Sequence, residues 1–145
     1  MAYTHVAHDC IVGNHVVMAN LATLGGHVEL GDWVSLGGGV LVHQFTKIGE
    51  HVFIGGGFRV VQDVPPYILA AGEPLNFSAI NQIGLRRRGF DRKTRSLIKE
   101  AYRLFFRSEN YNRKEALEKI RNEFENTREI KLILDFIESS NRGII

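Results

Sequence analysis

The chain has 145 residues, 44% hydrophobic and 23% charged, which is typical of a folded globular unit. Its single cysteine, Cys10, excludes a disulfide within one chain, and no apolar run approaches the roughly 18 residues that span a bilayer. The first residues carry neither a basic leader nor an apolar segment. We therefore expect a cytoplasmic protein without a secretory signal or stable membrane insertion.

Charge is unevenly divided along the chain. Residues 1–65 hold two cations and five carboxylates, whereas residues 66–145 hold 16 cations and 11 carboxylates. Most glycines also fall in the first part. This asymmetry predicts two modules, residues 1–66 and residues 67–145, and an acidic partner for the second.

The first module repeats every six residues. The repeating position is always aliphatic or methionine, and a small residue follows it at eight of ten sites: Val6, Val12, Met18, Leu24, Leu30, Leu36, Val42, Ile48, Ile54 and Val60. A period of six cannot keep one face of a helix, and the period of two of a β-sandwich is absent. The pattern predicts a parallel β-helix with three short strands per coil and coils about 4.8 Å apart. The glycines are expected at corners, where positive φ or close backbone approach is needed.

A helical module is expected after the repeat. Pro65 and Pro66 lack the N–H that a strand ladder requires, so the coils are expected to end there. Four helices should follow. The first is capped by Asn76 or Ser78, and the others begin after Asp91, Asn112 and Thr127.

Five stretches together resemble the UDP-N-acetylglucosamine O-acyltransferase family. They are His5–Cys10, Ala22–His27, Val42–Phe45, Gln62–Tyr67 and Gly84–Phe90. The resemblance implies a left-handed β-helix followed by a small α-helical domain. Members of the family carry further coils before the first motif, which hold part of the sugar-nucleotide site. A truncated chain that binds UDP-sugar poorly is therefore expected.

The resemblance also implies an activity. Such an enzyme transfers a (3-hydroxy)acyl chain from acyl carrier protein to the 3-hydroxyl of UDP-N-acetylglucosamine, the first step of lipid A biosynthesis. It works as a homotrimer without a cofactor, since the carrier thioester is the co-substrate. Two alternatives are a UDP-3-O-acylglucosamine N-acyltransferase and an inactive scaffold. Asp9 and the three arginines at 86–88 favour the O-acyltransferase.

Three residues match the family's catalytic positions. His8 is the expected base, because imidazole titrates near neutral pH, and Asp9 is expected to orient its ring. Gly26 lies 18 residues later, one full coil, and should donate its N–H to the oxyanion. The plain alternatives are a surface histidine, a solvated turn aspartate and a corner glycine.

The remaining matches are expected to bind substrates. His5, His27, His43 and Gln44 would line the cleft, and Gly56 would leave the acyl groove open for a donor of about fourteen carbons or more. Asn81, Arg87 and Arg88 would contact the nucleotide or the carrier, and further basic residues to Arg107 would dock the acidic carrier. Histidine clusters can hold zinc, but zinc would leave the other motifs unexplained, so no metal is expected. His15 and His51 are expected to be exposed, and aromatic interleaving typical of nucleic-acid binding is absent.

Overall fold

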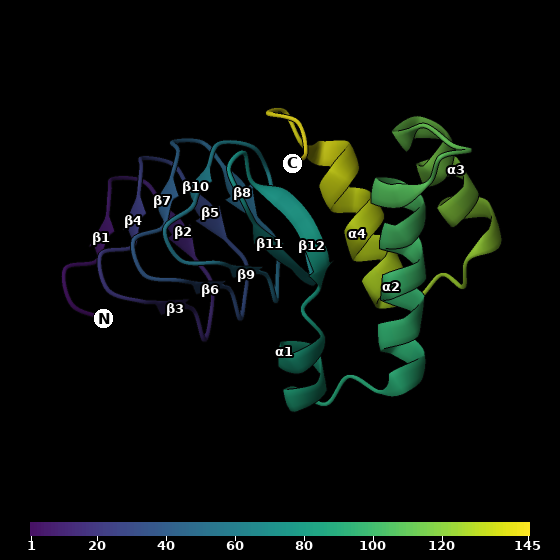
Figure 1. Cartoon of the computed structure of the whole chain (residues 1–145), viewed down its shortest axis with the longest axis horizontal. Helices are drawn as coiled ribbons and strands as arrows, with labels where there is room; N and C mark the ends of the chain where they lie inside the picture. Colours follow the sequence, from purple (N-terminus) through teal and green to yellow (C-terminus); the bar gives the residue numbers. More distant parts are fainter.

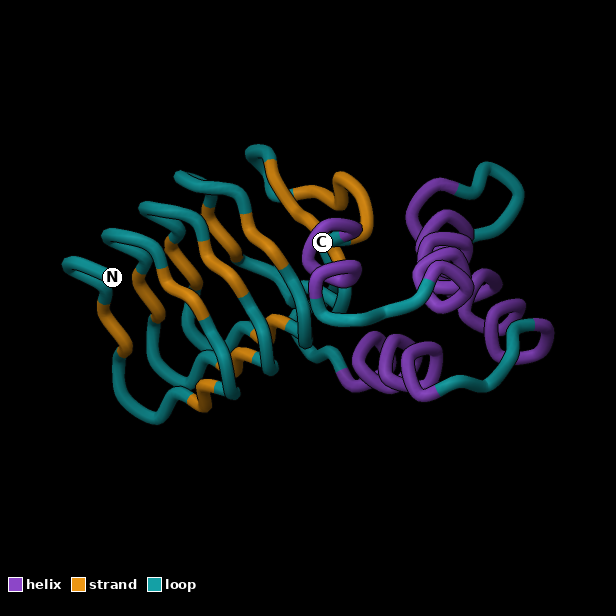
Figure 2. The backbone as a smooth tube through the Cα atoms, turned by 90° about the horizontal axis from the view of Figure 1, so that it is seen from below, coloured by secondary structure: helices purple, strands orange, loops and turns teal.

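The computed structural model describes all 145 residues and begins with a parallel β-helix (Figures 1 and 2). Ten two-residue strands form it: β1 (His5–Val6), β2 (Ile11–Val12), β3 (Val17–Met18), β4 (Thr23–Leu24), β5 (Glu29–Leu30), β6 (Ser35–Leu36), β7 (Leu41–Val42), β8 (Lys47–Ile48), β9 (Phe53–Ile54) and β10 (Arg59–Val60). They build three parallel sheets with the orders β1-β4-β7-β10, β2-β5-β8 and β3-β6-β9. The predicted β-helix is confirmed.

One coil is 18 residues long, so residues 18 apart lie side by side. His5 pairs with Thr23, and Val6 pairs with Leu24. From Leu24 onward the repeating aliphatic side chains are almost completely buried, as are the small residues four positions after them, such as Val28 and Val34. This burial explains the period of six, because each third of a coil sends the same two side chains inward, one aliphatic and one small.

The corners differ in one respect from the sequence prediction. Positive φ recurs every six residues, but three positions after the aliphatic residue and mostly at non-glycine residues: Asp9, His15, Leu21, His27, Trp33, Gly39, Phe45, His51 and Gly57. The glycine directly after the aliphatic residue instead allows the backbone of the neighbouring coil to approach closely. A β-carbon on Gly37 would lie 2.5 Å from the backbone N of Gly56, and one on Gly25 would lie 2.8 Å from that of Gln44.

The segment after the coils begins with strands, which corrects the expected start of the first helix but not its end before Gly89. Strand β11 (Ile68–Ala71) pairs in parallel with β9 and antiparallel with β12 (Asn76–Ile80). Asn76 and Ser78 therefore lie in a strand and cap nothing. Every second residue of β11 is buried, namely Ile68 and Ala70. The segment forms a strand because this side of it continues the apolar face of the sheet. Both strands fall in the segment that the sequence assigns to the helical module.

Four helices follow: α1 (Gln82–Arg87), α2 (Arg92–Arg107), α3 (Arg113–Glu123) and α4 (Arg128–Ser139). Asp91, Asn112 and Thr127 cap the last three through their side-chain oxygens, as predicted, and Asn81 caps α1. Helix α2 buries Ile98, Ala101, Tyr102 and Phe105, and the Tyr102 hydroxyl donates to the Pro66 carbonyl at 2.5 Å. None of the helices combines the length and apolar composition that crossing a bilayer requires.

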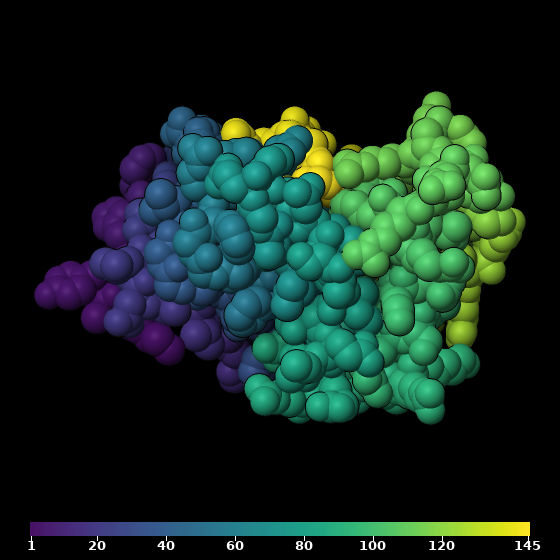
Figure 3. Space-filling model, in the orientation of Figure 1, coloured from purple at the N-terminus to yellow at the C-terminus, as the bar shows by residue number.

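The last residues of the chain return to the β-helix. Asp63 and Ile144 form a parallel bridge, and the Asp63 N–H donates to the Gly143 carbonyl at 2.9 Å. Figure 3 shows the yellow carboxy-terminal residues against the blue and teal coils. This contact brings the end of the helical module next to a corner of the β-helix.

Candidate active site at a corner of the β-helix

His8 and Asp9 lie at the corner between the β1-β4-β7-β10 sheet and the β2-β5-β8 sheet. Asp9 has positive φ, which turns its carboxylate back toward the preceding ring, and Oδ2 lies 2.9 Å from Nδ1 of His8. The same oxygen lies 3.7 Å from Nε2 of His27, one coil further on. The two imidazoles pack edge to face, 5.2 Å apart.

This geometry fixes the proton on the His8 ring. The hydrogen bond from His8, and secondly the charge of His27, lower the pKa of Asp9, so the carboxylate stays ionised and can only accept. Nδ1 of His8 must then carry the hydrogen. In the neutral ring Nε2 therefore keeps its lone pair, the arrangement that a general base requires.

Gly26 lies directly beneath the His8 ring, one coil away, as the spacing predicts. Its backbone is buried, yet its N–H donates no hydrogen bond within the chain. The equivalent N–H at another corner, that of Asn14, donates to Oδ1 of Asp32 at 2.7 Å. A corner amide at this position can therefore bind an anionic oxygen, and that of Gly26 has no partner within the chain.

Three further predicted residues lie at this corner. His27 stacks on Phe45 at 4.7 Å, and His43 and Gln44 follow β7 on the next coil, both exposed. The Gln44 side chain makes no hydrogen bond in the chain. His5 is exposed on β1, three residues before His8. Phe45 was not singled out by the sequence, although its 18-residue spacing from His27 places it in the same stack.

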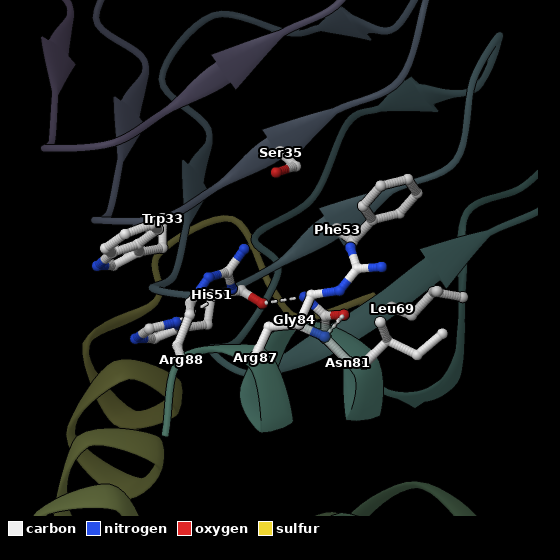
Figure 4. Close-up of a pocket in the computed structure, with 10 residues that line it drawn as sticks. Trp33, Ser35, His51, Phe53, Leu69, Asn81, Gly84, Arg87 and Arg88 are labelled. Carbon is white, nitrogen blue, oxygen red and sulfur yellow. Dashed lines mark hydrogen bonds between the residues drawn. The ribbon is translucent and has the colours of Figure 1, made fainter. Parts of the chain in front are cut away.

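A second group of predicted residues lies away from this corner, at a cavity of about 690 Å³ (Figure 4). The cavity is bounded by the β3-β6-β9-β11 face and α1, and Trp33, Phe53, Asn81 and Arg87 are among its lining residues. Asn81 is held by two bonds: Nδ2 donates to the His51 carbonyl at 2.9 Å, and Oδ1 accepts from the Gly84 N–H at 3.2 Å. Asn81 thereby fixes α1 against the coils.

The two neighbouring arginines of α1 differ sharply. Arg88 is held in place: its guanidinium lies 5.0 Å from the Trp33 ring centroid, and Nη1 lies 3.2 Å from Nδ1 of His51. Arg87 is exposed and makes no hydrogen bond or ion pair, and its side chain extends across the cavity toward Phe53 (Figure 4). Arg87 is thus the guanidinium available to a ligand.

The prediction that His51 is exposed is wrong. Only 7% of it is exposed, because Tyr67 and Phe90 pack against its ring and Arg88 covers Nδ1. Burial, followed by the charges of Arg88 and Arg128, lowers its pKa to about 4. His15 is exposed, as predicted, and stacks on Trp33 at 4.1 Å. The 18-residue spacing of His15, Trp33 and His51 was the signal for this second stack.

Gly56 occupies the third corner, exposed and beside Gly38. The predicted site residues therefore divide among three corners of a single β-helix. His8, Asp9, Gly26 and His27 are brought together, whereas Asn81, Arg87 and Arg88 form a separate group.

Basic residues cover the exposed side of α2. Lys99, Arg103 and Arg107 line a hollow of about 300 Å³ together with Phe77 and Ala79 of β12. Within the predicted basic set, Arg103 pairs with Glu100 and Lys93 with Glu125, while Arg92 and Lys99 make no ion pair. This surface has the charge that an acidic partner would need.

The one group of three possible metal ligands is His8, Asp9 and His27, whose ligand atoms lie within 4.8 Å of one another. All three are exposed, and Asp9 already accepts from Nδ1 of His8. The expectation that no metal is held here stays a prediction.

Comparison with known proteins identifies related chains. A family model described as UDP N-acetylglucosamine O-acyltransferase, domain 2, matches residues 63–145. An acyl-(acyl-carrier-protein)–UDP-N-acetylglucosamine O-acyltransferase of Syntrophobacter fumaroxidans is 49% identical over all of this chain and 56% of its own length. The solved UDP-N-acetylglucosamine acyltransferase of Bacteroides fragilis is 43% identical, with a TM-score of 0.94 over 98% of this chain and 55% of its own. The chain thus spans about half the length of the curated relatives it matches.

Proposed function

The chain belongs to the UDP-N-acetylglucosamine O-acyltransferase family, and on this premise we propose that its His8 corner transfers an acyl chain from a carrier-protein thioester to a hydroxyl of UDP-N-acetylglucosamine. The relatives carry both substrates in their name. One observation carries the proposal: a histidine with a free Nε2 lies directly over an unpaired backbone N–H. Acyl transfer needs these two groups side by side.

His8 begins the reaction as the base. Nε2 takes the proton of the sugar 3-hydroxyl, and the oxygen attacks the thioester carbonyl carbon. The ionised Asp9 stabilises the imidazolium that forms and keeps Nδ1 protonated.

Gly26 stabilises the intermediate. The carbonyl oxygen becomes an oxyanion and accepts the Gly26 N–H, which needs no rearrangement to donate. The carbon–sulfur bond then breaks, and the thiolate of the carrier leaves with the proton held by His8. A thiol has a pKa near 8.5, so it leaves readily and the reaction requires no cofactor.

The position of the cavity that Arg87 lines supports a site built from two copies of the chain. Arg87 presents a free guanidinium, which suits a diphosphate, but it lies at a different corner from His8. If both contact one UDP-sugar, each must come from a different subunit. We propose a homotrimer in which the His8 corner of one copy faces the Arg87 cavity of the next.

The carrier and the acyl chain occupy the remaining surfaces. The basic side of α2, including Lys99, docks the acidic carrier protein. The acyl chain passes the exposed Gly56, which has no side chain to block it. For an enzyme with these substrates, a cytoplasmic location is proposed.

The test measures acyl transfer directly. The chain is assayed alone and as a chimera, in which it replaces the matching 56% of the Syntrophobacter fumaroxidans relative. We expect 3-hydroxyacyl-carrier protein to acylate UDP-N-acetylglucosamine in the chimera, and His8→Ala to lower turnover by about 10² or more. An inactive chimera that is folded, or an active His8→Ala variant, would contradict the proposal. Acylation of UDP-3-O-acylglucosamine alone would assign the N-acyltransferase activity.

A further inference from the structure

We propose that Arg142 is a positioning residue that fixes the proton of His43 on Nε2, so that His43 donates a hydrogen bond to a substrate oxygen at the candidate active site. The inference rests on the proposed function for its substrate, but its structural half stands on the contacts of this chain alone. Three observations support it. The ladder of backbone hydrogen bonds between coils is interrupted at this corner, the Arg142 guanidinium contacts Nδ1 of His43, and Nε2 of His43 makes no hydrogen bond.

The ladder of backbone hydrogen bonds is interrupted at the active-site corner. His27 donates to the His8 carbonyl, and Phe45 donates to the Gly26 carbonyl, each one coil back. The next N–H in the series, that of Asp63, donates instead to Gly143, and Ile145 donates to the Asp63 carbonyl at 3.2 Å. The carboxy-terminal segment, residues 140–145, thus takes the place of the neighbouring coil.

Asp63 anchors this segment from inside. Its side chain is 1% exposed, Oδ1 accepts from the Lys47 N–H at 2.8 Å, and Oδ2 accepts from the Ser140 hydroxyl at 2.6 Å. Arg142 follows two residues later. Its Nε and Nη2 both donate to the Val61 carbonyl at 3.1 Å, which fixes the guanidinium beside the β-helix.

The guanidinium then meets His43. Nη2 of Arg142 lies 3.2 Å from Nδ1 of His43, and the Gln44 carbonyl lies 3.1 Å from the same nitrogen. A guanidinium can only donate and a carbonyl can only accept. These two partners require opposite tautomers of His43. The bond from the charged guanidinium is the stronger of the two, so with Arg142 in place Nδ1 accepts and the neutral ring carries its proton on Nε2. Without Arg142 the carbonyl is the remaining partner, and the proton would move to Nδ1.

The free Nε2–H allows His43 to donate a hydrogen bond to a substrate at the candidate active site. His43 is exposed, directly precedes Gln44, and makes no other side-chain hydrogen bond. An N–H donor suits a phosphate, amide or carbonyl oxygen, all of which the proposed substrates present. His43 and His8 thereby hold opposite tautomers, one to donate and one to accept.

The structural half is tested by nuclear magnetic resonance on the 145-residue chain with ¹⁵N-labelled histidine. His43 is assigned by the signals lost in His43→Gln. We expect Nε2 protonated and Nδ1 unprotonated in the parent, and the proton on Nδ1 in Arg142→Met. Ser140→Ala is the matched control, because it removes a tether of the same segment without touching His43, and it should keep the parental tautomer. A protonated Nδ1 in the parent, or an unchanged pattern in Arg142→Met, overturns the inference.

The functional half is tested by kinetics of the chimera. Arg142→Met should lower kcat/KM about tenfold, the effect of one hydrogen bond to a substrate oxygen, while Ser140→Ala stays near the parental value. Arg142→Lys, which keeps a donor and the charge, should recover part of the loss. If the tautomer changes and kcat/KM does not, His43 has no role as donor. A parent chimera that transfers no acyl group refutes the proposed function and the donor role, whereas the tautomer result stands separately.

Discussion

The imidazole of His8 fills the space that a side chain on Gly26 would need, since a β-carbon there would lie 2.7 Å from both Cε1 and Nε2 of the ring. Position 26 therefore requires glycine because of the His8 ring. The backbone conformation does not require it, since φ of Gly26 is not positive. Gly26→Ala should displace the ring and cover the free N–H, and lower turnover of the chimera by about 10² or more. Thermal melting of the variant should stay near that of the parent, since the ring is exposed and can move. A Gly26→Ala variant that turns over as fast as the parent would show that neither the His8 ring nor the Gly26 N–H takes part.

The two arginines of α1 should respond differently to replacement. Arg87→Ala should raise KM for the UDP-sugar about tenfold with little change in melting, and the effect should shrink at high salt. Arg88→Ala removes the contact with Trp33 and leaves Nδ1 of His51 without its donor. It should lower the free energy of unfolding by about 1–2 kcal/mol. Kinetics and denaturant unfolding of both variants test this prediction. A loss of stability in Arg87→Ala, with a raised KM only in Arg88→Ala, would refute it.

Buried His51 should make stability depend on pH. Its pKa falls from 6.5 to about 4 on folding, so the unfolded chain binds a proton in this range that the folded chain does not. The contribution of His51 to stability is therefore fully present above pH 6.5 and is lost as the pH falls toward 4, by about 3 kcal/mol. His51→Gln keeps an acceptor for Arg88 but does not titrate. Urea unfolding between pH 7 and 4 should show a smaller loss in His51→Gln, and an equal loss would contradict the assignment.

The proposed acyl groove predicts a change of chain-length preference. Gly56 is exposed, and a β-carbon there would meet the Gly38 carbonyl at 3.2 Å, a close contact that a small shift relieves. Gly56→Met should fill the groove and shift the preference of the chimera from donors of about fourteen carbons or more to shorter ones, by roughly 1–3 kcal/mol per carbon at the wall. Competition between carrier proteins loaded with different chains measures the preference. An unchanged preference would place the end of the groove elsewhere, with Phe53 the next residue to test.

The period of six made the β-helix predictable, because an inward aliphatic residue recurs in every strand and no other fold needs that spacing. The helix caps Asp91, Asn112 and Thr127 were equally predictable from local chemistry. Strand β12 was missed because Asn76 and Ser78 look like caps when the pairing partner, β11, is unknown. The left-handed winding stays a prediction.

The site was predictable where residues stack at intervals of 18, as His8 and Gly26 do. Contacts between distant parts of the chain were not. The burial of His51 was not predictable, because Arg88 and Phe90, which cover it, follow almost 40 residues later. The approach of Arg142 to His43 joins residues 99 apart and left no signal in the repeat.

A mixing experiment tests most directly whether one active site combines the His8 corner of one copy with the Arg87 cavity of another. His8→Ala and Arg87→Ala chimeras are assayed separately at low UDP-sugar, then refolded together in equal amounts and assayed again. Random assembly pairs an intact His8 with an intact neighbouring Arg87 at one site in four, so activity should rise to about a quarter of the parental value. Activity equal to the mean of the two separate variants would contradict the shared site.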